Sequence, residues 1–135
     1  MPKALFIETS ALLSFLFNEE RKKEVQKEFE SSERILASRL IKLETERAIH
    51  RLRTHYQCRE SDISEINRNA NLFWSKCDFV ELTKEICDLA GDIYPSQNLR
   101  SLDAIHLASF HYLQSKISNA SLLSFDKRIS EVLGS

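Results

Sequence analysis

Short apolar runs alternate along this chain with longer segments in which apolar side chains recur every three or four residues. Runs of four or five apolar residues suit buried strands, and the three-to-four spacing suits amphipathic helices. We predict strands at residues 3–7, 34–38, 78–82 and 120–125. Between and after them we predict helices at residues 9–17, 18–32, 39–56, 60–76, 83–95 and 97–116, with a short closing helix over 126–135.

The order of these elements predicts how the sheet is built. Strands alternate with helices, and no Asn-Gly or Asp-Gly pair marks a tight hairpin. Parallel strands need helical crossovers of this kind, and the helices then cover both faces of the sheet. We therefore expect an α/β fold, a three-layer α/β/α sandwich with a short parallel sheet of about four to five strands. We expect a single domain over residues 1–135.

The composition is that of an ordinary globular protein. Apolar residues make up 42% and charged residues 29% of the 135 residues, with a net charge of −1. Nucleic-acid binding must then come from a local basic face. The three cysteines, Cys58, Cys77 and Cys87, form no C-x-x-C pair and favour reduced thiols, and we expect Cys87 to pack in the core. With no signal peptide and no apolar run of membrane-spanning length, we expect a cytoplasmic protein and no membrane partner.

Hydroxyl side chains stand at several predicted helix starts, where they are candidate N-caps. Thr9 or Ser10 would cap the first helix, Thr83 the helix after the third strand, and Ser101 the helix that follows. A hydroxyl cap on the first helix would leave Glu8 free at the end of the first strand. That helix is apolar nearly all round, so it is equally suited to the core and to a dimer or partner interface.

Two acids directly follow predicted strands. Glu8 follows the strand at residues 3–7, and Asp126 follows the strand at residues 120–125. The carboxyl ends of parallel strands lie at one edge of the sheet, and ligand sites form outside that edge. We therefore expect these two carboxylates to lie close together.

A third acid, Glu44, lies at the border of an apolar helix face. At about 100° per residue, Ile41 and Ala48 fall within about 60° of it, while Arg47 and Arg51 flank its other side. Glu44 can form an ordinary surface pair with either arginine, or it can join the acids at the sheet edge. The sequence leaves both possibilities open.

A fourth acid, Asp103, falls in the first turn of an otherwise apolar helix. A carboxylate there gains ~0.3–1 kcal/mol from the helix dipole, which alone is enough to explain it. On a buried helix, however, an acid needs a cationic partner. His106 lies one turn later; it can contact the same site, although the sequence favours a buried structural histidine.

Four acids are thus predicted at one edge of the sheet: Glu8, Glu44, Asp103 and Asp126. Carboxylates packed together repel one another, and a divalent cation with oxygen ligands, Mg²⁺ or Mn²⁺, relieves the repulsion. Such an ion orients water for in-line attack on a phosphodiester. Arg47 and Arg51, next to Glu44, are then candidates for binding substrate phosphates.

Four segments resemble the signature segments of the PIN-domain family, and in particular the VapC-type toxin ribonucleases of bacterial toxin–antitoxin pairs. In order, they are LFIETSALLSFLFNEE, ASRLIKLETERAIHRL, LRSLDAIHLASF and LLSFDKRI. The resemblance covers nearly the whole chain and implies a parallel α/β/α sandwich.

The resemblance also implies which residues act. The acidic quartet of the family, catalytic and metal-binding, would be Glu8, Glu44, Asp103 and Asp126, with Ser10 and Ser124 as supporting hydroxyls. It implies Mg²⁺- or Mn²⁺-dependent cleavage of RNA by metal-activated water, a homodimer, and a cognate antitoxin that plugs the active site, often with an Arg. Most members carry Asp where this chain has Glu8. Two alternatives therefore stand beside the toxin ribonuclease: a degenerate domain that binds RNA or protein, and a housekeeping nuclease of RNA maturation.

Overall fold

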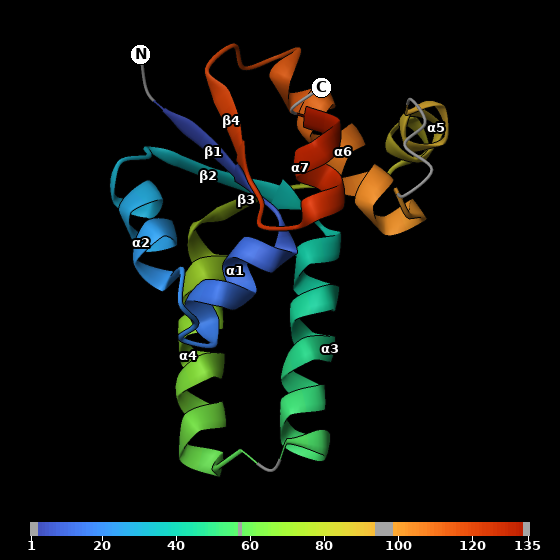
Figure 1. Ribbon diagram of the computed structural model, residues 1–135. Helices are drawn as coiled ribbons and strands as arrows, with labels where there is room; N and C mark the ends of the chain where they lie inside the picture. Colours follow the sequence, from blue (N-terminus) through green and yellow to red (C-terminus); the bar gives the residue numbers. More distant parts are fainter. Residues whose placement is uncertain (1–2, 57, 94–98, 134–135) are drawn as a thin grey trace.

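The computed structural model describes residues 3–56, 58–93 and 99–133, which contain four strands and seven helices (Figure 1). The strands are β1 (Ala4–Ile7), β2 (Arg34–Ser38), β3 (Cys77–Val80) and β4 (Ala120–Leu123). The helices are α1 (Thr9–Leu16), α2 (Lys22–Glu30), α3 (Leu40–His55), α4 (Glu60–Lys76), α5 (Lys84–Asp92), α6 (Ser101–Gln114) and α7 (Lys127–Leu133). The predicted order of strands and helices is confirmed, with most elements a few residues shorter than predicted.

All four strands are parallel, in the order β3-β2-β1-β4. Every residue of β1 is buried, as expected for a strand with neighbours on both sides and helices on both faces. The register pairs Ile7 with Leu123, and the Glu8 N–H donates to the Leu123 carbonyl at 3.0 Å. The residues that follow β1 and β4 are therefore neighbours at the carboxyl edge of the sheet.

Helices cover both faces of the sheet, so the three-layer α/β/α arrangement is confirmed (Figure 1). Successive strand residues point to opposite faces. Phe6 and Leu36 pack in a core with residues of α5 and α6. Ile7 and Ala37 pack in a second core with residues of α1, α2, α3 and α4.

The apolar helix α1 belongs to the core. Its buried residues are Thr9, Ala11, Leu12, Ser14 and Leu16, and the helix packs against α2, α3 and α4. Of the two roles open to it from the sequence, the structure shows the core role. None of the helices in the described residues is long and apolar enough to cross a bilayer.

The first helix is capped by Glu8, so the prediction of a Thr9 or Ser10 cap is wrong. Glu8 leaves β1 in extended geometry, with φ −100° and ψ 157°, and its carboxylate accepts the Ser10 N–H at 3.1 Å. Thr9 and Ser10 already have helical positions, because the strand ends only one residue before the helix begins. Glu8 is therefore not a free side chain.

At the start of α6 the predicted Ser101 cap is also wrong. Arg100 occupies the N-cap position, and Ser101 is the first helical residue. The Asp103 carboxylate accepts the Arg100 N–H at 3.2 Å and so satisfies a backbone donor before the first turn. The Thr83 cap is confirmed, because the Thr83 hydroxyl accepts the Ile86 N–H at 3.2 Å.

The cysteines are free thiols that differ in burial: Cys77 is buried, Cys58 is half-buried and Cys87 is exposed. The prediction that Cys87 packs in the core is wrong. The single buried residue of α5 is Ile86, so this helix covers the sheet with a narrow face and leaves the neighbouring Cys87 outside.

Candidate active site

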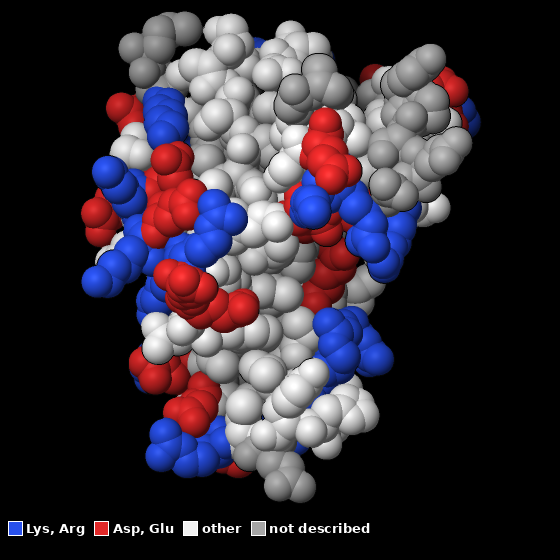
Figure 2. All heavy atoms as spheres, in the orientation of Figure 1, with Lys and Arg blue, Asp and Glu red and all other residues white. Residues whose placement is uncertain are grey.

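A cleft of about 830 Å³ lies where β1 and β4 end. It is lined by Glu8, Thr9, Ser10, Leu13, Leu43, Glu44, Arg47, Arg51, Arg100, Ser101, Leu102, Asp103, Asp126 and Arg128. The structure therefore brings the four predicted acids into one cleft from four different places in the chain. In Figure 2, acidic atoms lie between groups of basic atoms on the side of the molecule that carries α3 and α7.

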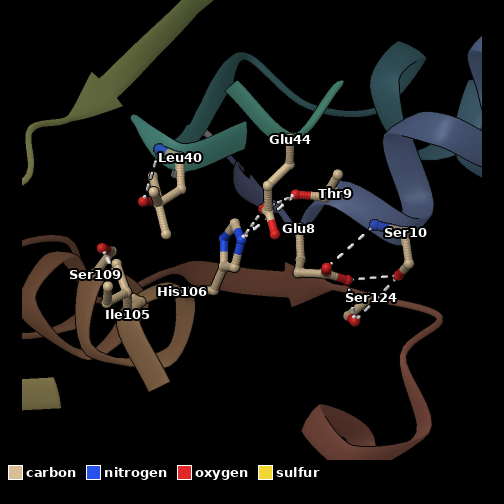
Figure 3. Close-up of polar contacts among 10 residues, drawn as sticks. Glu8, Thr9, Ser10, Leu40, Glu44, Ile105, His106, Ser109 and Ser124 are labelled. Atoms are coloured by element: carbon tan, nitrogen blue, oxygen red, sulfur yellow. Dashed lines mark hydrogen bonds and ion pairs between the residues drawn. The ribbon is translucent and has the colours of Figure 1, made fainter. Parts of the chain in front are cut away.

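Glu8 is held on the floor of this cleft by the two predicted supporting hydroxyls (Figure 3). Its Oε1 accepts from the Ser10 hydroxyl at 2.5 Å and from the Ser124 hydroxyl at 2.6 Å. The Ser10 hydroxyl in turn accepts the Phe125 N–H at 2.8 Å, which ties the start of α1 to the residues after β4. Only 5% of Glu8 is exposed, so this carboxylate is fixed in place.

Glu44 contacts Thr9 and His106 in the same cleft (Figure 3). The Thr9 hydroxyl donates to Glu44 Oε1 at 2.5 Å, and His106 Nε2 lies 2.6 Å from the same oxygen. Within the described residues Glu44 forms no ion pair with Arg47 or Arg51, so the surface-pair explanation is wrong. The other oxygen, Oε2, has no protein partner in that part of the chain.

The electrostatics of Glu44 follow from these contacts. Burial alone raises the pKa of this carboxyl, but the hydrogen bond and charge of His106, with the hydrogen bond from Thr9, outweigh burial and lower it overall. Glu44 is therefore held as a carboxylate, the form that binds a cation.

His106 belongs to the site rather than to the apolar core alone. It is 1% exposed, and because a carboxylate cannot donate, the proton of the contact sits on His106 Nε2. Its Nδ1 is buried and has no partner among the described residues. The polar contacts of this side chain are thus directed at Glu44 and, at 3.4 Å, at Thr9.

In Asp103 and in Asp126, one carboxylate oxygen accepts hydrogen bonds from backbone N–H groups at the start of a helix, and the other oxygen does not. Asp103 Oδ2 accepts from the Arg100 backbone, while Asp126 Oδ1 accepts the N–H groups of Arg128 at 2.8 Å and Ile129 at 3.2 Å. The remaining oxygens have no partner within the described residues. Asp103 needs no cationic partner there, because the start of α6 is exposed even though its middle is buried.

The donor set of the cleft fits a hard divalent cation. Carboxylate oxygens are the ligands that Mg²⁺ and Mn²⁺ prefer, and Glu44, Asp103 and Asp126 each keep one without a protein partner. In the described residues no three acidic, histidine or cysteine side chains already lie close enough together to hold a metal ion. The carboxylates would therefore have to draw together around an ion.

Four arginines line the cleft, two of which the sequence did not single out. Arg47 and Arg51 of α3 are the predicted pair, and Arg100 and Arg128 join them. Their positions in the sequence could have indicated that they line the cleft, because Arg100 lies three residues before Asp103 and Arg128 lies two residues after Asp126. Any residue that close to a strand-end or helix-start acid lies near the same edge of the sheet.

The model of the PIN domain family matches residues 5–134. The chain belongs to the PIN domain family. Two relatives of this PIN domain come from Mycobacterium tuberculosis: Ribonuclease VapC45 of strain CDC 1551 / Oshkosh and Ribonuclease VapC49 of strain ATCC 25618 / H37Rv. Each is 28% identical to it over 105 residues, which cover 78% of this chain and 73% of the relative. Both relatives are named as ribonucleases.

Proposed function

We propose that this PIN domain is an endoribonuclease that hydrolyses RNA phosphodiester bonds with the help of Mg²⁺ or Mn²⁺, and that it is the toxin of a toxin–antitoxin pair. The observation that carries the proposal is the meeting of Glu8, Glu44, Asp103 and Asp126 in one cleft of a PIN fold. The ribonuclease names of the two relatives support the reaction class. We propose that residues 1–135 act as one domain.

Each side chain has a distinct task in this proposal. The cation would be held by the unpartnered oxygens of Glu44, Asp103 and Asp126. The carboxylate of Glu8, fixed by Ser10 and Ser124, adds a further negative charge to the site. A bound divalent cation supplies an activated water and neutralises charge on the attacked phosphate. Ser10 and Ser124 position Glu8, and the Arg47 and Arg51 guanidinium groups bind substrate phosphates.

The proposal includes two protein partners. One is a cognate antitoxin that covers the cleft, and the other is a second copy of this chain. Large apolar side chains exposed on the surface, among them Leu43 and Leu102 at the cleft, support protein contacts there. We propose that the protein is cytoplasmic, and its free thiols support this.

A second candidate function rests on Glu8. Its two oxygens already accept three hydrogen bonds from the protein, and it is nearly fully buried. A carboxylate so committed can serve structure alone, in a domain that binds RNA or a partner without cleaving. Calorimetric titration with Mn²⁺ separates the two functions, because the nuclease must bind the ion and the degenerate module need not.

The deciding experiment is cleavage of a labelled RNA in Mn²⁺ by the parent protein and by Asp103→Asn. Asparagine keeps an oxygen that can accept the Arg100 N–H, so the start of α6 is preserved while the charge is lost. We expect cleavage by the parent, its abolition by a chelator, and a loss of at least about tenfold in the variant.

The matched control is Asp88→Asn, which removes an exposed carboxylate of α5 outside the cleft. It should cleave like the parent. Equal cleavage by the parent and Asp103→Asn would mean that this cleft is not the source of the activity, and absence of cleavage by the parent would refute the nuclease outright.

A further inference from the structure

The arginines of this chain divide into two groups according to their partners. Of the ten, six form ion pairs with a carboxylate within 4.0 Å: Arg21, Arg34, Arg39, Arg53, Arg59 and Arg68. Within the described residues the other four have no such partner: Arg47, Arg51, Arg100 and Arg128. All four unpaired arginines line the candidate active-site cleft.

The four unpaired arginines share their cleft with carboxylates. The same cleft holds four carboxylates, yet none of its arginines pairs with one of them. The contacts of Glu8 and Glu44 go to hydroxyls, to the Ser10 N–H and to His106 instead. The cleft therefore keeps its carboxylates and its guanidinium groups unpaired with each other. One oxygen each of Glu44, Asp103 and Asp126 is available to cations, and the arginines are available to anions.

The unpaired arginines lie on two sides of the acidic floor of the cleft, by which we mean the four carboxylates of Glu8, Glu44, Asp103 and Asp126. Arg47 and Arg51 are one helical turn apart on α3, so their side chains project next to each other. Arg100 and Arg128 stand at the starts of α6 and α7. In Figure 2 the basic atoms over α3 and those nearer α7 flank the acidic atoms.

The cleft has one pair of arginines on each side of its acidic floor. A ligand that carries several phosphates in a row fits this arrangement. Arginine binds phosphate through paired N–H donors, and a polynucleotide strand repeats that group at short intervals. A cleft of about 830 Å³ falls in the range of pockets that hold one small ligand, so it admits a few nucleotides of a single strand.

We propose that Arg47 and Arg51 on one side, and Arg100 and Arg128 on the other, bind phosphates of one RNA strand on both sides of the scissile bond. The strand then crosses the acidic floor with a phosphate-binding pair before it and another after it. This assignment rests on the proposed ribonuclease for the reaction, but the binding it describes needs no cleavage.

The test is RNA binding at several salt concentrations, with chelator present so that no cleavage occurs. The probe is a fluorescently labelled single-stranded RNA of about ten nucleotides, measured by anisotropy. For a single strand, each lost phosphate contact lowers the slope of log affinity against log salt by about 0.7. Arg100→Gln/Arg128→Gln should therefore lower the slope by about 1.4 and weaken binding at least tenfold.

The matched control is Arg59→Gln/Arg68→Gln, which removes the same charge from paired arginines outside the cleft. It should leave the slope as in the parent. Arg47→Gln/Arg51→Gln provides a second, independent variant with the same expected loss as the first pair, should the other variant fold poorly. Thermal melting of each variant establishes that it is folded.

The outcomes separate this assignment from the proposed function. Equal loss of slope in the cleft and control variants, or no RNA binding by the parent, overturns the assignment. Binding that depends on the cleft arginines, in a protein that cleaves no RNA in Mn²⁺, leaves the assignment standing and refutes the nuclease.

Discussion

His106 Nε2 lies 2.6 Å from Glu44 Oε1, joining a fully buried ring of α6 to a carboxylate of α3 that is 62 residues away in the sequence. Thr9 donates to the same oxygen from the start of α1. One oxygen of Glu44 is thus fixed by two donors from different elements, and the other has no partner among the described residues. His106 is a positioning residue for Glu44.

Replacing His106 should therefore impair the site through Glu44. His106→Leu removes the donor to Glu44 Oε1. Under the proposed metal-binding role of Glu44, we expect cleavage activity and Mn²⁺ affinity to fall about 10–100-fold. His106→Gln keeps an N–H donor at similar reach and should recover part of both. The measurements are RNA cleavage and calorimetric titration with Mn²⁺.

Ser109→Ala is the control for His106. Ser109 is fully buried on the same helix, and its hydroxyl donates to the Ile105 carbonyl at 2.8 Å without touching the cleft. Its activity should match the parent. A Gln variant as impaired as the Leu variant, or a Ser109→Ala variant impaired to the same degree, would show that burial rather than the contact with Glu44 matters.

Because the pKa of Glu44 is lowered by folding, the free energy of unfolding should depend on pH in the acidic range. Burial raises this pKa, but His106 and Thr9 lower it further than burial raises it, so folding favours the carboxylate. The resulting stability is present above the unfolded value of about 4.5 and is lost as pH falls through the lower folded value. The free energy of unfolding of the parent, relative to Glu44→Gln, should be steady above about pH 5.5 and decline as pH falls below that value. Urea denaturation at each pH measures it, and a difference that grows on acidification contradicts the assignment.

The sequence predicts the site well where geometry follows from chain order. Alternating strands and helices predict a parallel sheet, whose strands all end at one edge, so Glu8 and Asp126 were expected at the same edge. That β1 and β4 are direct neighbours there is shown by the structure. Helical periodicity likewise placed Glu44 at the border of the buried face. These expectations depend only on repeating backbone geometry.

What the sequence does not predict is the choice of partner. Helical spacing predicted Arg47 or Arg51 as the partner of Glu44, but in the structure its partner is His106. The packing of α6 beside β2 brings this distant side chain next to Glu44. The preference for hydroxyl side chains at N-caps favoured Thr9 or Ser10. Only one residue, Glu8, separates the end of β1 from the start of α1, so Glu8 is the N-cap. Such contacts depend on tertiary structure rather than on local pattern.

Glu8 should contribute to stability as well as to the cleft. Glu8→Ala removes the α1 cap and leaves the half-buried hydroxyl donors of Ser10 and Ser124 without their acceptor, and we expect a loss of about 1–3 kcal/mol in the free energy of unfolding. Glu8→Asp should lose less, because aspartate is a preferred N-cap. Glu20→Ala, an exposed acid just after α1, should change stability by less than about 0.5 kcal/mol. Urea denaturation compares them, and equal losses for Ala and Asp would argue against a capping role.

The thiols should differ sharply in reactivity. Burial, with a smaller contribution from the charge of Asp78, raises the pKa of Cys77 to about 12, although Arg39 opposes the rise. Because the thiolate is the reactive form, iodoacetamide at about pH 8.5 should modify the exposed Cys87 and spare Cys77, and in urea it should modify both. Folding favours the protonated thiol of Cys77, so its contribution to stability is present below about pH 9 and is lost as pH rises towards 12. Mass spectrometry of the alkylated peptides reads out the difference, and equal labelling of both cysteines in the folded protein would mean that β3 does not hold Cys77 away from water.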